Sequence, residues 1–106
     1  SDTVIDNIKQ IINNLIKETN SKIYLQSILP VVEKRLASGI KNITIDYVNE
    51  ELLKFAVVNS IEFLDNSSLM KDSSGNMSEN LSCDGLHLNG EAYRLWIENI
   101  RVKVNE

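Results

Sequence analysis

The sequence predicts an α/β fold in which helices and strands alternate. Three segments have apolar residues at helical spacing, and two short segments rich in branched and aromatic residues separate them. A helix between two strands favours a right-handed crossover and parallel pairing of the strands. The order helix, strand, helix, strand, helix is typical of the back half of an open α/β sheet, with helices above and below the strands.

The first helix is expected to begin at Asp2 or Thr3, either of which can cap it, and to end near Asn20. Its apolar stripe is wide, which predicts packing on a sheet. The stripe consists of Ile5, Ile8, Ile12 and Leu15, widened by Val4, Ile11 and Ile16.

The first strand is expected over 22–29, closed by Pro30, which cannot donate to a strand ladder. Ser27 lies in this strand and is a candidate nucleophile by residue type alone. No glycine elbow surrounds it, and Pro30 follows too soon for a helix, so a structural role is favoured. Residues 31–43 have little periodicity and are expected to form a loop with one helical turn.

The second helix is expected from Thr44 to about Asn59, and the second strand over 61–65. The apolar face of this helix would hold Ile45, Val48, Leu52 and Phe55, with Leu53 and Ala56 beside them. Residues 66–81 form the most polar stretch and predict a long loop at the ligand-binding end of the sheet. Leu69, Met70 and Met77 either pin this loop by packing, which is favoured, or contact an acyl chain.

The last helix is expected to begin with Asn89 as its cap. Tyr93 and Trp96 are expected in the core, on an apolar face completed by Ile97, Ile100 and Val104.

Length and composition bound the class of protein. The 106 residues leave room for one domain, 1–106. Eleven basic against fifteen acidic residues give a net charge of −4 without a basic run, which makes nucleic acid an unexpected partner. No apolar run reaches the ~18 residues of a membrane helix, and the N-terminus lacks a signal-peptide pattern, so the compartment stays open. The one cysteine, Cys83, excludes an internal disulfide and a zinc cluster, and a nucleophilic role for it is disfavoured.

The only histidine, His87, has a carboxylate three residues ahead of it, Asp84. An aspartate in a tight loop can accept a hydrogen bond from one imidazole nitrogen while the other nitrogen faces a nucleophile, which is the orienting half of a catalytic triad. The alternative is structural: Asp-Gly is a common turn, and a histidine before a helix can be a polar cap residue. Four residues do not decide between these interpretations.

The longer string Asp-Gly-Leu-His-Leu-Asn from Asp84, with Tyr93 and Trp96 after it, closely resembles the last sequence block of the GDSL, or SGNH, family of serine esterases and acylhydrolases. Residues 22–30 resemble that family's penultimate core strand, and residues 48–53 resemble the helix after it. The resemblance covers nearly the whole chain but only the C-terminal half of the family's usual domain. It implies a partial three-layer, flavodoxin-like α/β/α fold.

The resemblance also implies roles for two residues. Asp84 would orient and stabilise the imidazolium, and His87 would take a proton from a serine and give it to the leaving alcohol. The family's Gly-Asp-Ser and Gly-x-Asn-Asp motifs, which hold the nucleophile and the oxyanion hole, do not occur in this sequence. The chain is therefore expected to be inactive without the N-terminal half of the domain.

The implied substrate is a small-molecule, carbohydrate or lipid ester, and the strand and helix pattern is most similar to the platelet-activating-factor acetylhydrolase-like members. No metal or organic cofactor is implied. Two adjacent parallel strands make a marginal sheet, so we expect a homo-oligomer or a complementing N-terminal half to cover the open edge. The alternative function is a non-catalytic α/β interaction module that self-associates through this edge.

Overall fold

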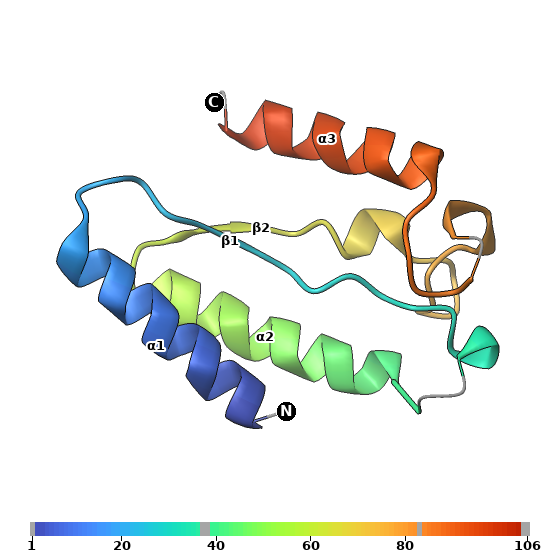
Figure 1. Cartoon of the computed structure of the whole chain (residues 1–106), viewed down its shortest axis with the longest axis horizontal. Helices are drawn as coiled ribbons and strands as arrows, with labels where there is room; N and C mark the ends of the chain where they lie inside the picture. The colour runs from blue at the N-terminus through green and yellow to red at the C-terminus, as the bar shows by residue number, and fades with distance from the viewer. Residues whose placement is uncertain (1, 37–38, 83, 105–106) are drawn as a thin grey trace.

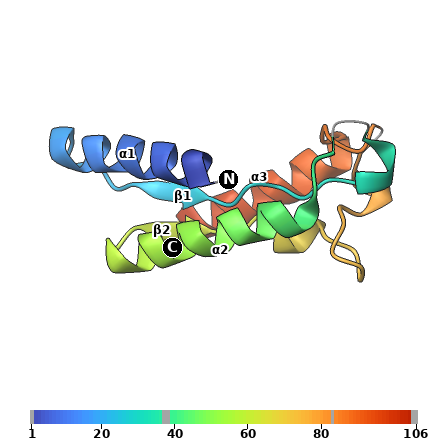
Figure 2. The ribbon, with the colours of Figure 1, turned by 90° about the horizontal axis from the view of Figure 1, so that it is seen from below.

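The predicted alternation of helices and strands is present in the computed structural model, which describes residues 2–36, 39–82 and 84–104. Helix α1 spans Asp2–Glu18, strand β1 Tyr24–Gln26, helix α2 Asn42–Val58, strand β2 Glu62–Leu64 and helix α3 Gly90–Val104. Helices α1 and α2 lie on one side of the two strands and α3 lies on the other (Figure 1 and Figure 2). These are the three layers of an α/β/α fold, and the predicted fold class is confirmed.

The two strands pair in parallel, as predicted. Tyr24 lies opposite Glu62, and Gln26 lies opposite Leu64. The ladder is shorter than the predicted strands: one further bond, from the Ser27 N–H to the Leu64 carbonyl at 3.0 Å, extends it beyond Gln26. The predicted strand over 22–29 was therefore too long at both ends, although its centre was right.

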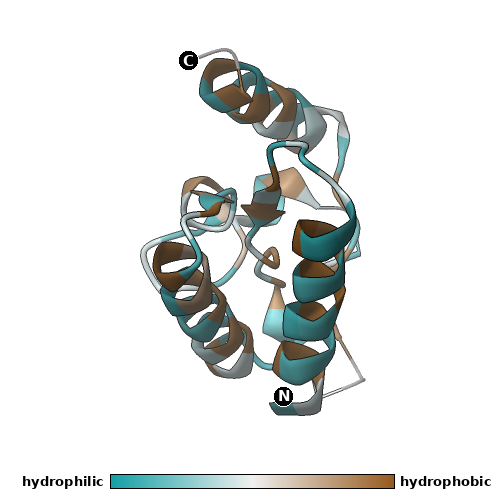
Figure 3. Cartoon of the chain, turned by 90° about the vertical axis from the view of Figure 1, so that its left-hand side faces the viewer, coloured by the Kyte–Doolittle hydropathy of each residue, from teal (hydrophilic) through white to brown (hydrophobic). Residues whose placement is uncertain are grey.

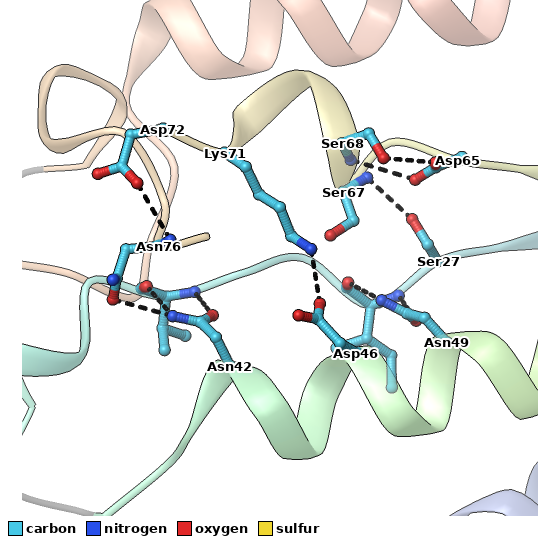
Figure 4. Close-up of polar contacts among 12 residues, drawn as sticks. Ser27, Asn42, Asp46, Asn49, Asp65, Ser67, Ser68, Lys71, Asp72 and Asn76 are labelled. Atoms are coloured by element: carbon cyan, nitrogen blue, oxygen red, sulfur yellow. Dashed lines mark hydrogen bonds and ion pairs between the residues drawn. The ribbon is translucent and has the colours of Figure 1, made fainter. Parts of the chain in front are cut away.

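The backbone after Ser27 stays extended because side chains of α2 bind it. Asn49 accepts a hydrogen bond from the Ile28 N–H at 2.7 Å and donates to the Ile28 carbonyl at 2.8 Å. Asn42 makes the same pair of bonds with Val31, both at 2.8 Å (Figure 4). The two asparagines are two helical turns apart and so share one face of α2. They supply the hydrogen bonds that a neighbouring strand would otherwise provide.

The connection between β1 and α2 contains a 3-10 turn, Glu33–Arg35, as expected for this loop. Helix α2 begins at Asn42, two residues before the predicted start at Thr44. The Asn42 N–H, which has no partner within the helix, donates to the Glu33 carboxylate at 3.2 Å. The early start places the Asn42 side chain on the helix face that binds Val31.

The core is divided into two clusters. One lies between α1, α2 and the sheet, and its buried members are Ile5, Val48 and Leu52. The other lies beneath the loops that follow the strands, and its buried members are Val32, Met70, Met77, Leu81 and Ala92. Met70 and Met77 are fully buried, which confirms that they pin the loop by packing, whereas Leu69 is 38% exposed.

Several predicted core residues are exposed, and these predictions were wrong for the chain alone. Tyr93 is 47% exposed, Ile97 57% and Ile11 59%. Trp96 is half-buried against the second cluster, and its indole N–H donates to Gln26 Oε1 at 2.9 Å. Hydrophobic residues run along all three helices (Figure 3). The two-stranded sheet is too narrow to cover these stripes completely, which accounts for the exposure.

We predict that Asn42→Ala lowers the free energy of unfolding by about 1–3 kcal/mol, because it leaves the buried Val31 N–H without a partner. The Val31 carbonyl loses its bond from Asn42 but still accepts one from the Met77 N–H at 3.0 Å. Urea unfolding followed by circular dichroism measures this change. Asn13→Ala, on the exposed side of α1, is the control and should change stability by no more than about 0.5 kcal/mol. Equal effects of the two substitutions would contradict the role of Asn42.

Candidate active site

Ser82 and residues 84–87 belong to a tight turn before α3, at the end of the molecule where the loops after both strands lie (Figure 1). Ser82 is buried, and its hydroxyl oxygen accepts a hydrogen bond from the Gly85 N–H at 2.9 Å. Gly85 has a φ of +91°, which a residue with a Cβ adopts only with strain. The Asp-Gly pair therefore makes a turn, as its sequence indicates.

Asp84 binds the turn and the imidazole at the same time. Its Oδ1 accepts hydrogen bonds from the backbone N–H groups of Leu86 at 2.9 Å and His87 at 2.8 Å. Its Oδ2 lies 2.5 Å from Nδ1 of His87. One carboxylate thus fixes both the backbone of His87 and the orientation of its ring.

These hydrogen bonds hold the pKa of the Asp84 carboxyl far below its usual value. The side-chain bond with His87 is the largest cause, followed by the backbone N–H groups of His87 and Leu86. Asp84 is therefore ionised at neutral pH and can only accept hydrogen bonds. It follows that the proton between the two side chains is on Nδ1 of His87, which leaves Nε2 of a neutral ring as an acceptor.

The imidazole is accessible. The His87 side chain is 78% exposed and that of Asp84 is 53% exposed. Across residues 2–36, 39–82 and 84–104, Nε2 of His87 has no hydrogen-bond partner, so it is open to a proton donor from outside the described chain.

The alternative interpretation of His87 as a helix cap is wrong. Asn89 caps α3, as the sequence predicts: its side-chain oxygen accepts a hydrogen bond from the Ala92 N–H at 3.0 Å. Its side-chain amide also donates to the Asn80 carbonyl at 2.6 Å. The cap therefore anchors the residue two positions after His87 without using the imidazole.

Ser27 has the structural role that was favoured for it. Its hydroxyl oxygen accepts a hydrogen bond from the backbone N–H of Asn66 at 3.0 Å. It accepts a second from the backbone N–H of Ser67 at 2.9 Å (Figure 4). Ser27 as a residue is 7% exposed. It joins the end of β1 to the loop after β2 and is held away from solvent. The other disfavoured nucleophile, Cys83, lies outside the described residues.

Two residues of the loop before α2 support the turn and were not predicted from the sequence. Val32 donates its N–H to the Gly85 carbonyl at 2.9 Å, and Arg35 donates from Nη1 to the Ser82 carbonyl at 3.0 Å. A Cβ on Gly85 would lie 2.7 Å from Cβ of Arg35. No sequence signal identified these contacts, because Val32 and Arg35 belong to a loop with no periodicity, about fifty residues from the turn.

Within the described residues, no group of three or more histidine, cysteine, aspartate or glutamate side chains gathers to hold a metal ion. The helices of the described part are also too short or too polar to cross a membrane.

Neither a protein-family model nor a curated protein matches this chain. Solved structures do match it. A GDSL-like lipase from Bacteroides thetaiotaomicron is 24% identical with a TM-score of 0.85, and the match covers 98% of this chain and 52% of that one. A Streptococcus pneumonia protein assigned as a platelet activating factor is 25% identical with a TM-score of 0.84, over 96% of this chain and 50% of that one.

The esterase domain of the ORF1 protein from a zebrafish retrotransposon is 18% identical with a TM-score of 0.79, over 98% of this chain and 58% of that one. The chain thus has the fold of the GDSL-like acylhydrolases, and the resemblance seen in the sequence is confirmed at the level of fold. It spans about half of the length of the solved structures that it matches.

We predict that the hydrogen bonds of Asp84 make stability depend on pH. Because the pKa of Asp84 is lower in the folded chain than the value of about 3.9 in an unfolded one, its stabilising contribution is complete above about pH 4. The contribution is lost as the pH falls further, through the folded-state pKa. Asp84→Asn lacks this contribution at every pH.

Urea unfolding from neutral pH down to about pH 2 measures both proteins under the same conditions. The wild type should be the more stable at neutral pH, and the difference should shrink on acidification. A difference that stays constant over this range would show that the Asp84 carboxylate does not act in this way.

Proposed function

We propose that this chain is the C-terminal part of the catalytic domain of a GDSL-like serine esterase. Asp84 and His87 would supply two members of its triad. The observation that carries the proposal is the bond between Asp84 Oδ2 and His87 Nδ1 at 2.5 Å, which leaves Nε2 exposed at the end of the sheet where open α/β folds bind ligands. The fold of the GDSL-like acylhydrolases supports the same assignment.

In the proposed reaction, a serine hydroxyl from the remaining part of the domain gives its proton to Nε2 of His87 while its oxygen attacks the ester carbonyl. Asp84 stabilises the imidazolium that forms, and the imidazolium then protonates the leaving alcohol as the tetrahedral intermediate collapses to an acyl-serine. Water repeats the sequence, with His87 as base, and releases the acid and the serine.

The substrate class in this proposal is an ester of a small molecule, carbohydrate or lipid. The nucleophile and the oxyanion hole would come from the rest of the domain, since Gly-Asp-Ser and Gly-x-Asn-Asp do not occur in the 106 residues. Loss of a single oxyanion donor already costs about a hundredfold or more in rate, so this chain by itself should be an inefficient hydrolase.

The test joins this chain to the half of the solved GDSL-like lipase that it does not cover and follows hydrolysis of a short-chain nitrophenyl ester. We predict that His87→Ala lowers kcat of this hybrid by about 10³-fold or more, because the general base is removed. Asp84→Asn should also lower kcat strongly, since an amide does not hold the Nδ1-protonated ring.

Asp65→Asn is the matched control. Asp65 also accepts hydrogen bonds from a turn, through the Ser68 N–H at 3.1 Å and the Ser68 hydroxyl at 2.6 Å, but it is not bound to an imidazole. It should leave kcat nearly unchanged. If His87→Ala and Asp65→Asn have equal, small effects on a hybrid that hydrolyses the ester, the proposed role of His87 is wrong.

The second candidate is a non-catalytic α/β interaction module, in which Asp84 and His87 only fix a loop. It is favoured by the apolar surface of the chain and by its two-stranded sheet. An apolar hollow of about 380 Å³ on α3 is lined by Trp96, Ile97, Ile100, Arg101 and Val104. Under either function we propose that another polypeptide, the rest of the domain or a second copy, covers this surface and the open edge of β1.

For the chain alone, the covering polypeptide would be a second copy. We predict that multi-angle light scattering finds a dimer or a larger assembly, and that Ile97→Asp shifts it toward the monomer by placing a charge on the apolar face. Asn13→Asp adds the same charge to the exposed side of α1 and should not. A monodisperse monomer at high concentration would rule out self-association.

A further inference from the structure

The Asp84–His87 pair lies at the surface of the chain and is not enclosed in a pocket. Both side chains are more than half exposed, so packing around the ring does not fix its position. Their geometry depends on the backbone of the turn, because Asp84 Oδ1 binds the N–H groups of Leu86 and His87. Whatever holds this backbone therefore also sets the direction of Nε2.

The turn contacts residues 32–35 of the connection between β1 and α2. The Val32 N–H donates to the Gly85 carbonyl at 2.9 Å. The missing side chain of Gly85 lets the turn approach so closely that a Cβ would lie 3.1 Å from the Val32 carbonyl oxygen and 2.7 Å from Cβ of Arg35. The stem of Arg35 thus forms the surface on which Gly85, the residue after Asp84, lies.

The guanidinium of Arg35 holds the other end of the same turn. Its Nη1 donates to the carbonyl of Ser82 at 3.0 Å, and Ser82 is only 2% exposed. A charged donor on a carbonyl that water hardly reaches makes one of the stronger hydrogen bonds in a protein. From Ser82 the contacts continue to the pair, since its hydroxyl accepts from the Gly85 N–H at 2.9 Å and donates to Asp84 Oδ1 at 3.3 Å.

We infer that Arg35 is a positioning residue, which acts through Ser82 and Gly85 to hold the Asp84–His87 pair in its reactive geometry. The inference rests on the proposed function, since it gives Arg35 a part in the same site. Arg35 also lies 3.7 Å from Glu79, but this ion pair is shared with Lys34, which is 2.9 Å from the same carboxylate. The bond to Ser82 therefore distinguishes Arg35 from its neighbour.

Nitrogen NMR of the imidazole tests the inference, and its signals need no assignment because the chain has one histidine. In the ¹⁵N-labelled chain, at a pH where the imidazole is neutral, the nitrogen chemical shifts give the ratio of the Nδ1-protonated to the Nε2-protonated ring. The wild type should be mainly Nδ1-protonated. Arg35→Met should lower this ratio by about threefold or more, the factor that the net contribution of one hydrogen bond produces in an equilibrium.

Two further variants distinguish the effect of the Arg35–Ser82 hydrogen bond from an effect of charge near Glu79 and from a loss of folding. Arg35→Lys keeps the positive charge and most of the stem but loses the planar fork, so the ratio should fall in the same direction. Lys34→Met removes the other cation beside Glu79 and should leave the ratio unchanged. If Arg35→Met loses its helical circular dichroism signal, Arg35→Lys decides the question.

The outcomes distinguish this inference from the proposed function. A wild-type ring that is mainly Nε2-protonated would overturn both, because Asp84 would not be holding Nδ1–H. A wild type that is mainly Nδ1-protonated, with ratios that neither Arg35 variant changes, would overturn the positioning role alone. An equal change in Lys34→Met would assign the effect to charge near Glu79 and would also overturn it.

Discussion

The candidate site depends on one carboxylate that serves two partners. Asp84 closes a turn through backbone N–H groups and orients the imidazole of His87 through its second oxygen. Because Gly85 adopts a positive φ, the carboxylate and the ring come within hydrogen-bond distance although only two residues separate them. The pair is therefore a local structure, which requires support for its backbone but no surrounding pocket.

That support comes from a segment placed by α2. Asn49 and Asn42 hold the extended backbone at Ile28 and Val31, and the chain then passes beneath the turn at Val32 and Arg35. Side-chain amides of α2 thus make the backbone hydrogen bonds that a neighbouring strand would make, beyond the point where the ladder between β1 and β2 ends. This links the layer of α1 and α2 to the turn that holds Asp84 and His87, through the hydrogen bonds of Val32 with Gly85 and of Arg35 with Ser82.

The sequence was sufficient for the order of elements, their parallel pairing and the Asp84–His87 pair, because each depends on local spacing or on a few adjacent residues. It was insufficient for the extent of β1, since the bonds after Ser27 come from side chains of a helix further along the chain. It also misplaced Tyr93 in the core, because periodicity marks an apolar face but does not say what covers it. Arg35 gave no signal, since its contact with Ser82 spans 47 positions.

The proposed function requires that this chain supply the aspartate and the histidine of a serine-esterase triad but not its nucleophile. Intact mass after incubation with a fluorophosphonate, which labels activated serines, tests this most directly. We expect an unmodified chain, since Ser27 is buried and its oxygen accepts hydrogen bonds from two backbone N–H groups. A stoichiometric adduct on any serine of the chain would contradict it, and peptide mapping would then identify a nucleophile within these residues.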